Sequence, residues 1–153
     1  KEFVHREKTM VSERLAYTAR SEEKLKRLMG KWQTPDLADQ FIQEVQPFFE
    51  TESFRIYICN SNGEQISSNF RKTAGFWHGE PQHSGSHWAF RPYFLENMML
   101  MKASHKGRLS DIYADIETGE MIRTFSYPLS DECFLFIDLS YDFLSENDYL
   151  LFQ

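Results

Sequence analysis

Three histidines are the residues whose type could bind a metal ion. His78, His83 and His87 fall within one segment, and imidazole nitrogens are common zinc ligands. Their spacings of five and four residues have no cysteine nearby and no helical register. Such spacing is weak support for a zinc site. We therefore expect no metal and no cofactor in this chain.

Carboxylates could instead do acid–base chemistry, and Asp111, Asp115 and Glu117 stand close together in the chain. They lie on or beside a predicted hairpin, where acidic residues commonly cap turns or remain solvated. No nucleophile with an evident base stands beside them. The sequence also lacks a phosphate-binding glycine loop, a serine-hydrolase elbow and a zinc-protease helix motif. We expect the chain not to be an enzyme.

The cysteines give no sign of redox chemistry. Cys59 and Cys133 are the only two, and each lies inside an apolar run typical of a strand. With no CxxC pair and no disulfide framework, the pattern fits a reducing compartment. Both side chains are predicted to be small apolar groups in the core.

Composition restricts the class of partner. The chain has 153 residues, a net charge of −6 and a pI near 5.4, and its 17 Lys and Arg are outnumbered by 23 Asp and Glu. This balance argues against nucleic-acid binding, which needs a basic surface. No apolar run approaches the ~18 residues of a membrane span. We expect a cytoplasmic domain, and the missing initiator Met with the abrupt helical start suggests a preceding segment.

Two helices are predicted before the first strand. Residues 3–32 contain no Pro and no Gly before Gly30, and their apolar side chains form a narrow stripe: Val4, Val11, Leu15, Leu25, Met29 and Trp32. The pattern favours a connector helix and leaves dimerisation open, because the heptad repeat is imperfect. Thr34 and Pro35 then provide a cap and a first position for a second helix that runs to about Phe49.

The remaining chain reads mainly as strands. Residues 54–70 form two short apolar runs around an SNG turn, which indicates a hairpin. Residues 71–86 are rich in Gly, His, Pro and Ser and are predicted to be a long surface loop, a candidate lid or binding loop. A helix over 90–104 and strands over 109–115, 120–128 and 132–139 follow. The segregated pattern predicts the α+β class, with a five-stranded antiparallel sheet flanked by helices.

Three segments resemble, in order, motifs of the Cache or PDC family of PAS-like sensor domains. They are HWAFRPYF at 87–94, YADIETGE at 113–120 and TFSYPL at 124–129. The first hairpin, YICNSNGEQISSN, is also similar, so the resemblance covers about residues 54–139. The match is closer to the signalling domain that follows EAL domains in YkuI-type bacterial proteins, which carries the same long lead-in helix.

The resemblance implies a set of ligand-binding residues. In ligand-binding Cache relatives, an Arg at the helix start and the aromatic rings beside it hold a carboxylate, while a hairpin Asp takes an ammonium group. Carried over, these are Arg91, Tyr93, Tyr113 and Asp115, with Trp88 as a wall. Arg matches a carboxylate through its planar fork. The alternative for Arg91 and Asp115 is a structural ion pair.

The resemblance also implies a division of the chain and a function. Residues 1–33 would be a connector helix, and residues 34–153 a PAS-like PDC/Cache sensor domain. The domain would bind a small carboxylate or amino-acid-like metabolite and regulate an attached EAL domain in a cyclic di-GMP signalling protein. From the narrow apolar stripe of the first helix we also expect a homodimer. The alternative function is a ligand-free dimerisation or scaffolding module.

Overall fold

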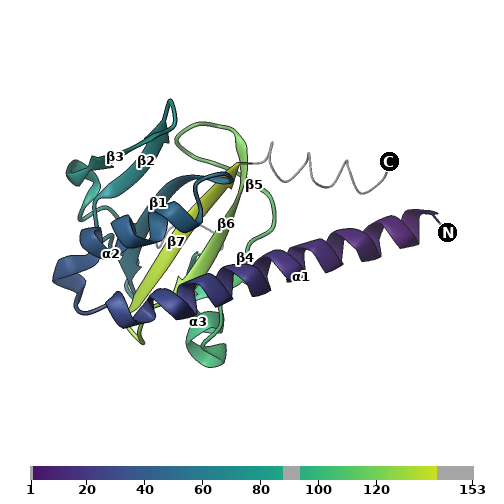
Figure 1. Cartoon of the computed structure of the whole chain (residues 1–153), viewed down its shortest axis with the longest axis horizontal. Helices are drawn as coiled ribbons and strands as arrows, with labels where there is room; N and C mark the ends of the chain where they lie inside the picture. The colour runs from purple at the N-terminus through teal and green to yellow at the C-terminus, as the bar shows by residue number, and fades with distance from the viewer. Residues whose placement is uncertain (1, 88–93, 141–153) are drawn as a thin grey trace.

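The computed structural model describes residues 2–87 and 94–140, which form an α+β fold with helices on both faces of one antiparallel sheet (Figure 1). The helices are α1 (Glu2–Leu28), α2 (Ala38–Val45) and α3 (Phe94–Ser104), with 3-10 turns η1 (Met29–Lys31), η2 (Pro35–Leu37), η3 (Gln46–Phe48) and η4 (Pro81–His83). The strands are β1 (Ser53–Asn60), β2 (Asn69–Thr73), β3 (Phe76–Glu80), β4 (Arg108–Leu109), β5 (Tyr113–Ala114), β6 (Met121–Pro128) and β7 (Cys133–Ser140).

The first two helices end where their sequences predict. The long helix α1 ends at Leu28 and gives way to the 3-10 turn η1, which contains Gly30, the first glycine in the chain. The next helical segment opens with Pro35 in its first turn and closes in η3, which contains Pro47. Proline is tolerated in the first turn of a helix and disrupts its interior, so these two prolines delimit the segment.

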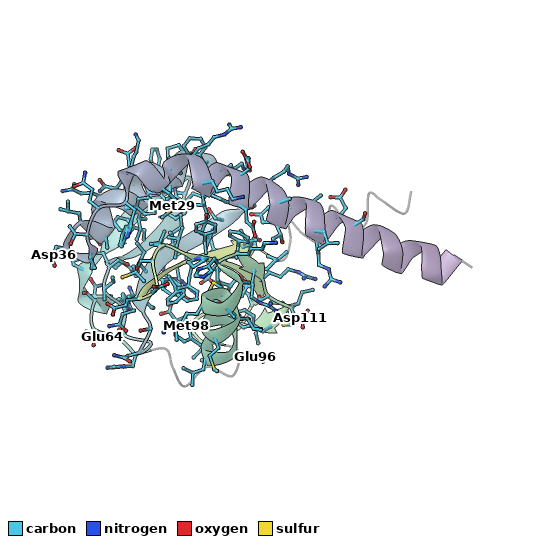
Figure 2. All side chains as sticks on the ribbon, turned by 90° about the horizontal axis from the view of Figure 1, so that it is seen from below. Met29, Asp36, Glu64, Glu96, Met98 and Asp111 are labelled. Atoms are coloured by element: carbon cyan, nitrogen blue, oxygen red, sulfur yellow. The ribbon has the colours of Figure 1, made fainter. Side chains whose placement is uncertain are left out.

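Each face of the sheet buries a separate apolar cluster. The larger cluster contains Leu25 of α1 and Phe41 of α2 packed on Ile56 of β1, whereas the smaller joins Met98 of α3 to Tyr57 of β1. Residues 56 and 57 point to opposite faces because side chains alternate along a strand. Figure 2 accordingly shows α1 and α3 on opposite sides of the sheet.

In the described residues the sheet has seven strands, in the order β3-β2-β1-β7-β6-β4, with β5 also paired to β6. The prediction of an antiparallel sheet is confirmed, and the count of five strands is too low. The predicted strand over 109–115 is interrupted: only β4 and β5 pair with β6, and between them the Ser110 hydroxyl accepts the Thr124 N–H at 2.9 Å.

The expectation of a surface loop over 71–86 is wrong for its first half. Residues 69–80 form the β2–β3 hairpin, and the turn between the strands uses positive φ angles at Ala74 (53°) and Gly75 (82°). The strand β3 keeps all its side chains exposed or half-buried. An edge strand of this kind has no buried face, so it lacks the alternation of apolar and polar residues by which strands are recognised in sequence.

No helix in the described part of the chain combines the length and the apolar character needed to cross a membrane.

Candidate functional site

The candidate site lies on the face of the sheet that α3 covers, where three central strands place two rows of side chains. In one row, Tyr57 of β1 lies opposite Phe136 of β7, which lies opposite Ser126 of β6. In the next row, Arg55, Asp138 and Thr124 are aligned in the same way. The face therefore carries a mainly aromatic row, with Ser126 at one end, beside a polar row.

A cavity of about 150 Å³ opens between these rows and α3. Its lining residues share a mixture of rings, small apolar side chains and neutral polar groups: Tyr57, Phe94, Asn97, Ser110, Tyr113, Ala114, Ile116, Thr124, Ser126 and Phe136. None of these described residues carries a charged side chain. Cavities with an apolar wall and a few convergent polar groups are the usual form of small-molecule sites.

The hydroxyl groups of the cavity differ in their hydrogen bonding. Thr124 Oγ1 donates to Asp138 Oδ1 at 2.7 Å and lies 2.5 Å from the Tyr113 hydroxyl. Because Thr124 has only one proton to give, Tyr113 must donate to it. Ser126 is 1% exposed, and within the described residues its Oγ has no hydrogen-bond partner.

Behind the cavity, Arg55 forms the centre of a buried ion cluster. Its Nη1 lies 3.1 Å from Asp115 Oδ1 and 2.8 Å from Asp138 Oδ2, and its Nη2 lies 2.9 Å from Asp115 Oδ2. Glu117 approaches Nη2 at 3.1 Å and also pairs with Arg71 at 2.6 Å. Arg55, Asp115 and Asp138 are all at most 1% exposed. Three carboxylates thus share one buried guanidinium.

The pairing stabilises the charged forms of both partners. Burial raises the pKa of Asp115, but hydrogen bonds and charge from Arg55 outweigh it, so this pKa lies below its usual value. Burial likewise lowers the pKa of Arg55, yet its bond to Asp115 and the neighbouring carboxylate charges hold that pKa above its usual value. Arg55 and Asp115 are therefore both charged at neutral pH.

Asp115 also organises the turn that follows it. Its Oδ2 accepts hydrogen bonds from the Thr118 backbone N–H at 3.1 Å and the Thr118 hydroxyl at 2.9 Å, while its carbonyl accepts the Gly119 N–H. Gly119 has a φ of 74°, a conformation that glycine adopts without strain. The ETG turn is therefore held by the same carboxylate that pairs with Arg55.

Two residues of the predicted ligand-binding set, Tyr113 and Asp115, lie in the described part of the chain. Tyr113 lines the cavity, whereas Asp115 is occupied by Arg55 and Thr118 and is absent from the described lining. The predicted residues Trp88, Arg91 and Tyr93 lie outside the described residues. Their roles and that of Asp115 remain predictions.

Sequence reasoning missed several residues that shape the site. Arg55 and Asp138 look like isolated charges in apolar strands, and Thr124 and Ser126 look like ordinary strand residues. A usable signal was present, because a charge inside an otherwise buried strand requires a partner.

The histidine segment gives no metal centre in the described part of the chain, where no group of three His, Cys, Asp or Glu side chains is placed to hold a metal ion. His83 instead lies 3.8 Å from Glu80.

Known proteins are similar to this chain in sequence and in structure. A model of the EAL-domain associated signalling protein domain family matches residues 1–151. The uncharacterized EAL-domain containing protein YkuI of Bacillus subtilis is 49% identical over 113 residues, covering 74% of this chain and 28% of YkuI. The crystal structure of that protein, with an EAL domain and in complex with substrate c-di-GMP and calcium, superimposes with a TM-score of 0.83 at 38% identity, covering 94% of this chain and 36% of that one. The chain spans about a third of these relatives.

More distant structures share the fold alone. The ligand-binding domain of the Campylobacter jejuni chemoreceptor Tlp3, in complex with 4-methylisoleucine, has a TM-score of 0.59 at 10% identity, covering 91% of this chain and 57% of that one. The extracellular domain of the putative histidine kinase vpHK1S-Z8 has a TM-score of 0.63 at 12% identity, covering 95% and 59%. The fold is thus similar to that of Cache/PDC sensor domains, and the family match shows that the chain belongs to the EAL-domain associated signalling protein domains.

Proposed function

We propose that this chain is the non-catalytic sensory domain of a bacterial, cytoplasmic cyclic di-GMP signalling protein, in which it binds a small polar metabolite and regulates an attached EAL domain. The observation that carries the proposal is the cavity between the sheet and α3, which joins an apolar wall to neutral polar groups. Family membership supports the EAL partner. Any phosphodiesterase chemistry would belong to that EAL domain.

The packing of α1 supports a route from the cavity to the rest of the protein. Thr124 and Ser126 line the cavity, and Phe125 between them points to the other face of β6. There its ring meets the ring of Tyr17 edge-on, with centroids 6.4 Å apart. Glu22, also on α1, accepts the Gly107 N–H at 3.0 Å. A ligand that shifts β6 would therefore act directly on α1.

Ligand binding should appear as stabilisation that depends on an open cavity. Across a panel of carboxylates, amino acids and their neutral analogues, we expect at least one compound at 100 times its Kd to raise Tm by roughly 5–10 °C. Ala114 lines the cavity and is exposed, so Ala114→Phe should block access and abolish the shift. Ala103→Phe, on an exposed position of α3 away from the lining, is the matched control.

The proposed regulation has to be tested in a longer protein, in which this chain is joined to its EAL domain. The active compound should change the rate of cyclic di-GMP turnover in that longer protein, and Ala114→Phe should remove the change. A panel without any stabilising compound would contradict the sensory function.

A dimerisation function is favoured by one exposed side chain of α1. The N-terminal half of this helix extends beyond the sheet (Figure 1). Leu15, at the middle of the helix, is 66% exposed. Exposed large apolar groups on a projecting helix favour contact with a second copy.

We expect Leu15→Glu to weaken self-association at least tenfold, because it places a charge in the proposed contact. Sedimentation equilibrium over a concentration series measures this change. Lys26→Gln alters the net charge by the same amount at another exposed position of α1 and should leave association unchanged. Equal association of both variants and the wild type would place any dimer contact elsewhere.

A further inference from the structure

The inner end of the cavity is its wall on the sheet, which Tyr57, Thr124, Ser126 and Phe136 form. Its charge depends on which carboxylates are free to face it. Asp138 belongs to the polar row, and Arg55 binds both Asp138 and Asp115, which are buried carboxylates. Neither lies in the described lining. Thr124, which does line it, directs its proton to Asp138. Among the described residues, the inner wall therefore offers a bound ligand no free charge.

A charged group would be disfavoured at this wall. An ammonium or carboxylate that leaves water needs a partner of opposite charge or several hydrogen bonds. Arg55 is already bound by Asp115, Asp138 and Glu117, which excludes it as a ready partner for a ligand carboxylate. An ammonium would find both buried aspartates engaged.

One polar group at the wall does lack a partner. Ser126 Oγ is buried and has no hydrogen-bond partner among the described residues, although most buried polar atoms in proteins have one. The side chain shares its face with Phe136, its cross-strand neighbour. A ligand hydroxyl or carbonyl placed against Ser126 would satisfy it.

The aromatic part of the lining fits a flat apolar group of a ligand. Phe136 stacks with Tyr57 at a centroid distance of 5.3 Å and with Phe94 at 5.0 Å. The cavity of about 150 Å³ matches the size that holds a single benzene ring in an apolar protein core.

We infer that the inner end of the cavity binds an uncharged group, a small apolar body with one hydroxyl or carbonyl, and that Ser126 is the specificity-determining residue that recognises this oxygen. The inference rests on the proposed sensory function and narrows it. The inference disfavours an amino-acid ligand that is bound with its ammonium group against the sheet.

Four probes that share a phenyl ring and differ in the group attached to it test the inference: benzyl alcohol, toluene, benzylamine and benzoate. Titration into the ¹⁵N-labelled chain, followed by amide chemical shifts of the cavity residues, gives a Kd for each probe. We expect benzyl alcohol to bind tightest. Ser126→Ala should weaken the binding of benzyl alcohol about tenfold, which corresponds to the loss of one hydrogen bond of ~1.4 kcal/mol. The same change should leave the Kd of toluene within a factor of two of the wild-type value. Ser84→Ala, at an exposed position away from the lining, should change neither.

The outcomes separate this inference from the function on which it rests. Tighter binding of benzylamine or benzoate at the same amides would overturn the uncharged inner end and leave the sensory function intact. An equal loss of affinity for benzyl alcohol and toluene in Ser126→Ala would overturn the role of the Ser126 hydroxyl. Absence of shifts with all four probes would count against both the inference and the cavity as a binding site.

Discussion

Replacing Arg55 by alanine should lower the free energy of unfolding by about 3–5 kcal/mol, because it leaves Asp115 and Asp138 buried without their counter-charge. Each of these carboxylates is at most 1% exposed and cannot recover its hydration without opening the sheet. The turn at Thr118 should loosen as well, since Asp115 holds it. Urea unfolding at neutral pH, monitored by circular dichroism, measures the loss.

Two further variants identify the cause of the stability loss in Arg55→Ala. Arg27→Ala removes the same side chain from an exposed position of α1 and should change stability by no more than about 0.5 kcal/mol. Adding Asp115→Asn and Asp138→Asn to the Arg55 variant should restore part of the loss, because neutral amides tolerate burial better than unpaired carboxylates. A loss below about 1 kcal/mol for Arg55→Ala would show that the cluster is not a structural element.

Truncating Leu25 to alanine should cost about 2–5 kcal/mol, the usual range for a fully buried leucine. Leu25 is 0% exposed and belongs to the same apolar cluster as Ile56 of β1 and Phe41 of α2. The truncation leaves a cavity that the surrounding side chains only partly fill. Thermal and urea unfolding of the intact chain provide the measurement.

The same helix supplies the control. Leu15→Ala makes an identical chemical change at a position that is 66% exposed, and it should alter stability by no more than about 0.5 kcal/mol. The pair tests the expected division of the chain at residue 33, because a large effect at Leu25 means that the second half of α1 folds with the sheet. A small effect at both positions would support an independent connector helix.

The elements with a fully buried face could be predicted from the chain. The strands expected over 120–128 and 132–139 correspond closely to β6 and β7, because both are nearly continuous buried runs between turn signals. The resemblance identified the sensor class from motifs in these same strands and turns. Tyr113, which its motif predicts to bind a ligand, lines the cavity, and its role in binding stays a prediction.

Pairings between distant parts of the chain depended on the tertiary structure. Arg55 and Asp115 are 60 residues apart in sequence, and Arg55 and Asp138 are 83 apart. Their contact follows from the order of strands in the sheet and from the register of β1 against β7. Local periodicity carries no information about either, so Asp115 could be predicted as a polar residue of the hairpin but not as the partner of Arg55.

The α+β class, the buried strands and the similarity to sensor domains could be predicted from the amino-acid sequence, because alternation, turn residues and motifs are local properties. Two features depended on the tertiary structure: which charges are neutralised, and which polar group at the cavity has no partner among the described residues. Arg55 binds both buried aspartates, so the described lining of the cavity is uncharged, and Ser126 remains as its unpaired hydroxyl within the described chain. The physical reason is that a charge inside a protein acts through its nearest partners, and these are set by strand order and register.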